Sequence, residues 1–274
     1  MKYSFMSFSC PELTLDGMLS LAEKIGYDGI EPRAESKHQH GVEIEAGAEQ
    51  RKIIRQKVTD SPVKLSCVAT SCVYADPATV KQNVARTLQF IDLAADIGCS
   101  RIRVFGGVIP DGIGREAAID QVAKSLRSAA DRAAERGVKI CMETHDHWCN
   151  PDNVAEVMHR ANHPAVCVNW DVMHPVRQED WTIDRAFHVL KPWIKHIHFH
   201  DGKRKTGGDE SDHSGYRHAE MAPVGEGFVD HRRVVQLMQT IFYEDYLSGE
   251  WINWEPYEKH LPRELATLKG YEKQ

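Results

Sequence analysis

The 274-residue sequence has no apolar run of transmembrane length, and its first six residues lack the long apolar stretch of a signal peptide. Its seven cysteines are odd in number and scattered, which favours reduced thiols over a disulfide framework. A formal charge of −6 argues against the clustered basic surface that nucleic acids select. We therefore expect a cytoplasmic protein without a membrane or nucleic-acid partner.

The sequence does contain a regular alternation of short strand-like runs and longer amphipathic segments. Glycines 26, 98 and 137 each follow a helical pattern and precede a strand, as helix C-terminal caps do. The alternation predicts an α/β fold, a single (β/α)8 TIM barrel that spans residues 1–274 as one domain. The eight expected strands cover residues 3–8, 28–31, 63–69, 101–106, 138–143, 166–171, 194–199 and 251–255.

Four acid or imidazole side chains lie at or near the ends of the last four expected strands. They are Glu143, Asp171, His198 and Glu255. The carboxyl ends of the strands of such a barrel meet at one face, where catalytic groups gather. Oxygen and nitrogen ligands gathered there are the kind that hold a divalent cation.

Strand alternation places these side chains on the face that points into the barrel. On the expected sixth strand Asn169 and Asp171 share a face, and on the seventh His196, His198 and His200 do. A simpler interpretation is a set of barrel-lining polar residues that satisfy one another. Three carboxylates in one ring, however, would repel one another and raise their pKa values without a neutralising cation. We therefore favour a metal site.

Several short motifs carry a family resemblance. They are Cys-Met-Glu-Thr-His at 141–145, Asp-Val-Met-His-Pro at 171–175, His-Phe-His-Asp at 198–201, Trp-Glu-Pro at 254–256, Gly-Tyr-Asp-Gly-Ile-Glu at 26–31 and Val-Gly-Glu-Gly at 224–227. With them the chain resembles the sugar phosphate isomerase/epimerase family of the xylose-isomerase-like TIM-barrel superfamily. The resemblance implies one divalent metal ion (Mn, Mg, Co or Zn) bound by Glu143, Asp171, His198 and Glu255. It selects His198 because the family pattern is His-x-x-Asp.

The resemblance also implies substrate contacts. His174 resembles a substrate-contacting histidine of the family, and Arg204 matches an arginine of the ketose 3-epimerase branch, although a solvated basic turn also explains Arg204. His200 stands where many relatives carry lysine, and either contacts substrate or is a bystander. His145 and Trp148 lie just past Glu143, where a substrate wall would be, and a structural role explains them equally well.

Two further features lie outside this set. Glu31 and Arg103 are expected to point inward, and we interpret them as a structural ion pair because a buried charge needs a partner. The segment 202–227 after the seventh strand is long and polar, and its position predicts that it covers the active-site mouth.

These features predict a metal-dependent enzyme that acts on a sugar or related polyol. The metal would stabilise an enediolate while Glu143 and Glu255 act as acid and base, which gives epimerisation or isomerisation. A lyase reaction is the alternative, as in inosose and dehydroshikimate dehydratases. An endonuclease IV-like phosphodiesterase is disfavoured, because residues 68–71 and 104–107 lack the histidines that its trinuclear zinc site needs. A non-catalytic sugar-binding protein, and a dimer or tetramer, remain open.

Overall fold

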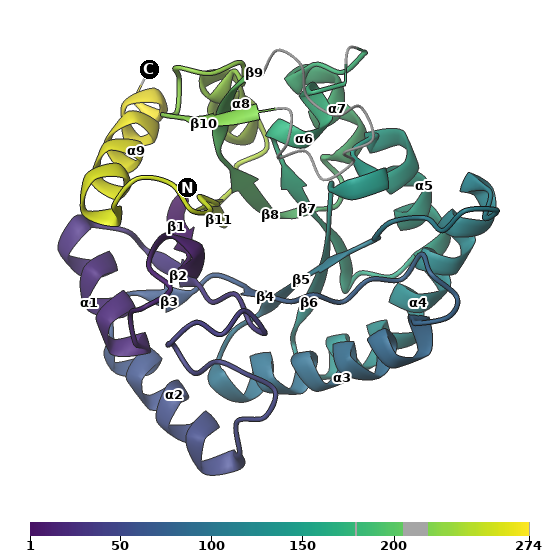
Figure 1. Ribbon diagram of the computed structural model, residues 1–274, viewed down its shortest axis with the longest axis horizontal. Helices are drawn as coiled ribbons and strands as arrows, with labels where there is room; N and C mark the ends of the chain where they lie inside the picture. Colours follow the sequence, from purple (N-terminus) through teal and green to yellow (C-terminus); the bar gives the residue numbers. More distant parts are fainter. Residues whose placement is uncertain (179, 205–218, 274) are drawn as a thin grey trace.

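The computed structural model describes residues 1–178, 180–204 and 219–273, and strands alternate with helices along these segments (Figure 1). The strands are β1 (Lys2–Met6), β2 (Gly29–Glu31), β3 (Lys64–Leu65), β4 (Val68–Ala69), β5 (Arg101–Phe105), β6 (Lys139–Glu143), β7 (Val166–Asp171), β8 (Ile194–Phe199), β9 (Asp201–Arg204), β10 (Ala219–Ala222) and β11 (Tyr246–Gly249). The helices are α1 (Leu15–Ile25), α2 (Ala48–Asp60), α3 (Val80–Ile97), α4 (Arg115–Glu135), α5 (Pro151–Ala161), α6 (Met173–Val176), α7 (Ile183–Leu190), α8 (His231–Thr240) and α9 (Tyr257–Glu272), with 3-10 turns at Ser7–Ser9 and Asp146–Trp148.

The main sheet is a parallel barrel surrounded by helices, as the alternation predicts. Its strand order is β3-β2-β1-β11-β8-β7-β6-β5-β4. The two end strands of this order, β3 and β4, are successive pieces of one barrel strand that is interrupted at residues 66–67. The Ser66 backbone N–H still bonds to the Ile30 carbonyl, and the Thr70 N–H bonds to the Arg103 carbonyl. The sheet therefore curls back on itself, and the predicted (β/α)8 fold is confirmed.

The first seven predicted strands overlap observed ones, whereas the eighth was placed wrongly. The last barrel strand is β11, which pairs with β1 and β8, and it ends at Gly249 instead of spanning 251–255. Trp251 is fully buried and packs at 5.3 Å from the Phe199 ring. Its indole also lies where a side chain at Gly249 would be. The apolar run that indicated a strand is therefore a packing segment beyond the strand end.

Local signals explain the helix boundaries. Asn150 caps α5 by accepting from the Asp152 N–H at 2.9 Å, and Pro151 occupies the first helical position. Gly26 ends α1 with φ 96°, a left-handed conformation that glycine adopts without strain. The capping signals read from the sequence thus set where the helices stop and the strands begin.

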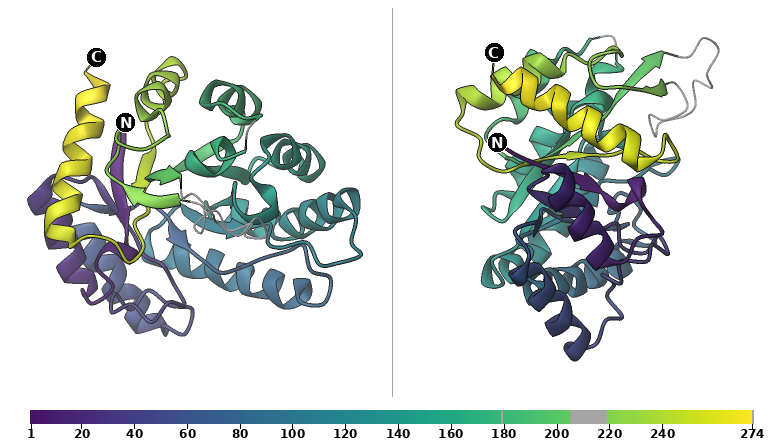
Figure 2. Two further views of the ribbon diagram at one scale, coloured as in Figure 1. Left: turned by 45° about the horizontal axis from the view of Figure 1, so that its top comes forward. Right: turned by 90° about the vertical axis from the view of Figure 1, so that its left-hand side faces the viewer.

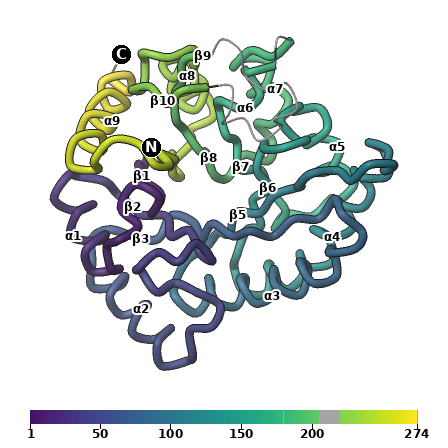
Figure 3. Tube along the Cα trace, viewed as in Figure 1, coloured from purple at the N-terminus to yellow at the C-terminus, as the bar shows by residue number. Residues whose placement is uncertain are grey.

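The chain winds round the barrel once, so its two ends meet (Figure 3). The N-terminal ammonium of Met1 and the hydroxyl of Tyr3 both bond to Glu272, at 2.9 and 3.0 Å. Tyr27 donates to the Leu261 carbonyl of α9 at 2.9 Å. In Figure 2, α9 accordingly lies across the outside of the barrel beside the N-terminal strand and helix.

A two-stranded antiparallel ribbon, β9 and β10, follows β8. Fully buried Asp201 fixes its base by accepting backbone N–H groups of four residues at 2.9–3.2 Å: Gly202, Gly225, Gly227 and Val229. Residues 205–218, the middle of the segment expected to cover the mouth, lie outside the described residues.

All seven cysteines are buried free thiols, in agreement with the expectation of reduced cysteines. None of the helices within the described segments is both long enough and apolar enough to cross a membrane.

Candidate metal centre

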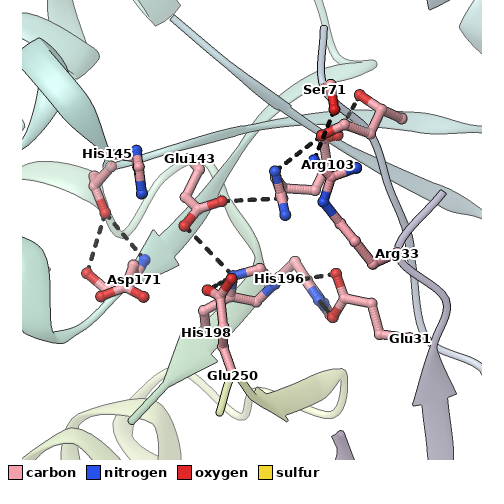
Figure 4. Close-up of polar contacts among 12 residues, drawn as sticks. Glu31, Arg33, Ser71, Arg103, Glu143, His145, Asp171, His196, His198 and Glu250 are labelled. Carbon is pink, nitrogen blue, oxygen red and sulfur yellow. Dashed lines mark hydrogen bonds and ion pairs between the residues drawn. The ribbon is translucent and has the colours of Figure 1, made fainter. Parts of the chain in front are cut away.

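Four buried polar side chains converge at the carboxyl ends of the barrel strands (Figure 4). Glu143 ends β6, Asp171 ends β7, His198 lies on β8, and Glu250 directly follows β11. One ligand atom from each lies within 4.8 Å of those of the other three. We call these four residues the ring. Three of them, Glu143, Asp171 and His198, are among the four ligands that the family resemblance implied.

Glu255, the fourth expected ligand, is not brought to the ring. Its side chain is 27% exposed, and its carboxylate forms ion pairs with Lys259 at 3.0 Å and Arg263 at 2.8 Å. The cause is the shifted strand end, because β11 stops at Gly249, six residues before the expected end at residue 255, and delivers Glu250 instead. Glu250 is therefore the residue that the sequence interpretation missed.

His198 connects the ring to a buried acid behind it. Its Nδ1 faces the ring, 3.1 Å from Glu250 and 3.5 Å from Glu143, while its Nε2 lies 3.0 Å from Glu31. Burial acts to lower the pKa of His198, but the three carboxylates, Glu31 foremost, outweigh it and raise that pKa well above its ordinary value. A carboxylate on Nε2 fixes the tautomer that leaves the Nδ1 lone pair for a metal.

Glu31 and Arg103 were expected to pair with each other, but they do not. Glu31 bonds to His196 at 2.8 Å as well as to His198, and burial, which raises its pKa, is outweighed by the two imidazoles, which hold it well below the usual range. The Nε of Arg103 lies 3.0 Å from Glu143, and its Nη1 donates to the Thr70 carbonyl at 2.9 Å. Both residues are buried as predicted, but each holds a different ring member.

Backbone groups and a histidine hold Asp171. Its Oδ1 accepts the N–H groups of Met173 and His174 at 2.9 and 3.1 Å, and its Oδ2 lies 2.9 Å from Nε2 of His200. Burial acts to raise the pKa of Asp171, yet His174 and His200 hold it far below its ordinary value. The anionic form of Asp171 is therefore built into the fold.

Three of the five residues predicted to contact substrate gather beside the ring. His145 and His174 are stacked edge to face with centroids 4.7 Å apart, and His174 lies 5.4 Å from His200. Burial lowers the pKa of His174 to about 3, which keeps this imidazole neutral, whereas the pKa of His145 is raised because Asp146 and Glu143 outweigh burial.

The other two predicted substrate residues lie in different surroundings. Trp148 is fully buried over Gly106, and its Nε1 donates to the Gly107 carbonyl at 2.8 Å. Packing explains its position without a ligand. Arg204 is exposed at the end of β9, with its guanidinium 5.5 Å from the ring centroid of Phe228.

The ring fits a divalent cation. Five buried atoms that point into it lack a hydrogen bond of good geometry within the described structure, although ion-pair contacts surround them. They are both carboxylate oxygens of Glu143, Oδ2 of Asp171, Nδ1 of His198 and Oε2 of Glu250. Three carboxylates and one imidazole are a donor set that suits Mn²⁺, Mg²⁺, Co²⁺ or Zn²⁺. A cation there would satisfy these atoms together and balance the clustered negative charge.

The fold and the ring define a (β/α)8 barrel with a buried carboxylate–histidine centre at the carboxyl ends of its strands. Residues 19–271 match the model of the xylose isomerase-like TIM barrel family, and the chain belongs to this family. The resemblance seen in the short motifs is thereby confirmed.

Individual relatives are distant in sequence. The chain is 21% identical to a 3-dehydroshikimate dehydratase of Bacillus anthracis over 92% of this chain and 91% of that protein. Among solved structures it is similar to the probable 3-DHS dehydratase involved in petrobactin synthesis from Bacillus anthracis (19% identity, 98% and 99% of the chains, TM-score 0.78). It is also similar to the IOLI protein with a bound zinc atom, at 19% identity over 99% of this chain and 96% of that chain, with a TM-score of 0.77. A D-psicose 3-epimerase in the presence of D-fructose is similar at 14% identity over 100% of both chains, with a TM-score of 0.77. Structural similarity at such identities shows the shared fold.

Proposed function

We propose that the protein is a divalent-metal-dependent epimerase or isomerase of a sugar or related polyol. The observation that carries the proposal is the convergence of Glu143 and Glu250 on His198 from two different strands, β6 and β11. The ring residues would hold the metal, which as a Lewis acid polarises a carbonyl and stabilises the negative charge that develops on it. The similarity to an epimerase structure supports this choice.

The two glutamates supply the proton chemistry. A carboxylate on each side of a bound substrate can remove the proton next to the carbonyl and return one from the opposite side, which inverts that carbon. Glu250 replaces Glu255 in this role. Glu250 is ionised at neutral pH, since His198 outweighs burial and lowers the pKa of Glu250 to about 2. Arg103 orients Glu143 through the 3.0 Å ion pair.

Deuterium uptake tests the reaction. The Mn²⁺-loaded protein is incubated in deuterated water with candidate ketoses, and the carbon-bound positions are followed by NMR. We expect a single deuterium beside the carbonyl of the substrate, and we expect Glu143→Gln and Glu250→Gln to abolish it while Glu255→Gln retains it. Turnover of a substrate without deuterium incorporation would refute the proton-transfer proposal.

A dehydratase is the second candidate, and the position of His145 favours it. This partly buried imidazole follows Glu143 by two residues, and its Nδ1 lies 2.9 Å from Asp146, which helps to raise the pKa of His145 against burial. A protonated imidazole there could donate a proton to a departing β-hydroxyl after the α-proton has left. The dehydratase relative gives independent support.

Product absorbance separates the two candidates. A dehydratase extends the conjugation of its substrate: 3-dehydroshikimate becomes an aromatic dihydroxybenzoate, and a keto-inositol becomes a conjugated enone. Either product should give a new ultraviolet band, and His145→Gln should remove that band. An epimerase gives no such band. Elemental analysis of the purified protein tests the shared premise, because a protein that retains no metal after loading contradicts both.

A further inference from the structure

Arg33 is a cation at the mouth of the barrel that the proposed chemistry does not use. It directly follows β2, and its backbone pairs with Ala69 at the end of β4. Its N–H donates to Ser7 Oγ, just past β1, at 2.8 Å. Arg33 therefore lies at the same carboxyl ends of the strands as the ring, but on the part of the barrel formed by β1, β2 and β4, away from β7 and β8.

The guanidinium of Arg33 has more N–H donors than hydrogen-bond partners among the described residues. Nη1 bonds to the Ala34 carbonyl and Nη2 donates to Ser71 Oγ at 2.7 Å. A guanidinium carries five N–H donors, so three remain without a partner in the described part of the chain. No carboxylate of the described residues lies within ion-pair distance of Arg33, whereas Arg103 is neutralised by Glu143 at 3.0 Å.

The surroundings of Arg33 favour an added anion. Figure 4 shows its side chain reaching from the end of β2 toward Arg103 and Ser71, on the side of Glu143 away from Asp171. Burial and the like charge of Arg103 lower the pKa of Arg33 to about 10, against the opposing effect of Glu250 and Glu143. It therefore stays protonated at neutral pH beside a second cation.

We propose that Arg33, with Ser71, binds an anionic group of the substrate, a carboxylate or a phosphate ester, while the reacting carbonyl lies at the ring. A planar guanidinium with free donors matches such a group in a two-point contact. The inference deepens the proposed function and rests on it for the position of the reacting atoms. It narrows the substrate from polyols in general to acidic or phosphorylated ones.

Matched probe pairs test the proposal by binding alone. Calorimetric titration of the Mn²⁺-loaded protein compares shikimate with its neutral methyl ester, and D-fructose 6-phosphate with D-fructose. We expect the anionic member of one pair to bind at least about tenfold more tightly, the size of a hydrogen bond to a charged group. The pair that shows the preference identifies carboxylate or phosphate as the anion.

Variants assign the preference to Arg33. Arg33→Met should reduce the ratio of the two affinities to near unity and leave the affinity for the neutral probe unchanged. Arg127→Met, which removes a surface arginine of α4 paired with Asp131, should keep the wild-type ratio. Arg33→Gln, which can still donate to Ser71, replaces the methionine variant if that variant does not fold.

Two results would overturn the inference. They are a wild-type protein without preference in either pair, and a preference that survives loss of Arg33. Because no turnover is measured, a failed deuterium exchange with an intact anion preference would refute the proposed reaction alone.

Discussion

Exchanging Glu250 or Glu255 for glutamine gives the sharpest test of the ring, because the two residues are five positions apart and lie in opposite surroundings. Glu250 is buried beside His198, and Glu255 is paired at the surface with Lys259 and Arg263. Loss of residues that only support a metal ligand costs about 10–100-fold in affinity. Loss of a direct ligand should therefore cost at least about 100-fold.

The magnitude follows from linkage between binding and folding. At a metal concentration about 100 times the wild-type Kd, binding stabilises the folded protein by about 2.7 kcal/mol. A variant with a Kd raised about 100-fold is stabilised under the same conditions by only about 0.4 kcal/mol. For Glu255→Gln the metal-induced gain should stay at the wild-type value, with a general loss below about 1 kcal/mol from its surface ion pairs.

The assay is thermal unfolding with and without Mn²⁺, together with a direct titration of the metal. We expect the metal-induced rise in Tm to be nearly abolished in Glu250→Gln and unchanged in Glu255→Gln. Circular dichroism of both metal-free variants controls for folding. If Glu255→Gln loses the metal response while Glu250→Gln keeps it, the assignment of the ring is wrong.

Three further predictions concern stability. Gly249→Ala should lower the free energy of unfolding by about 1–3 kcal/mol or more, because the added carbon would overlap the indole of Trp251. Gly270→Ala on α9 should instead raise it by up to about 1 kcal/mol, because there the added carbon meets open space. Equal Tm changes in the two variants would contradict the packing argument. Asp201→Asn should lower the free energy of unfolding, measured in urea, by at least about 2 kcal/mol, because the Asp201 carboxylate accepts four backbone N–H groups. A loss below about 0.5 kcal/mol would contradict this role. Burial raises the pKa of Glu43 to about 7, so the folded chain holds the carboxyl proton more tightly than the unfolded chain does. The stability of the wild type relative to Glu43→Gln should therefore decline from about pH 5 to about pH 8. A Tm difference between the two proteins that does not change with pH would refute this prediction.

The strands that the sequence locates well share a physical cause. Runs such as Val166–Asp171 and Ile194–Phe199 are buried on both faces, apart from the exposed Lys195. Their alternation of polar and apolar residues correctly orients Asn169, Asp171 and His198 toward the barrel interior. A periodic pattern enforced by burial on both sides is readable without coordinates.

The last strand was misplaced because its own signal is weak. Tyr246–Gly249 has only four residues, of which one is serine and one glycine, while the aromatic run from Trp251 to Trp254 looks more like a strand. Gly249 is small because the Trp251 indole packs against it, a tertiary constraint that no local pattern expresses.

A signal against Glu255 was nevertheless present. Glu255 precedes Pro256 and stands four residues before Lys259, and an acid at the start of a helix with a lysine at i+4 is typical of an exposed surface pair. By contrast, Glu250 follows its strand directly, as the ends of β6 and β7 deliver Glu143 and Asp171.

The ring is held by partners that the sequence could not assign to it. Arg103 holds Glu143, Glu31 holds His198, and the backbone of α6 holds Asp171, whereas Glu250 contacts only His198 among the side chains described. Three of the proposed ligands are thus fixed from behind before any cation binds, which would lower the ordering cost of metal binding. The fourth has no such support, so Glu250 is the member that can move a proton without breaking an ion pair outside the ring, and this asymmetry favours it over Glu143 as the base.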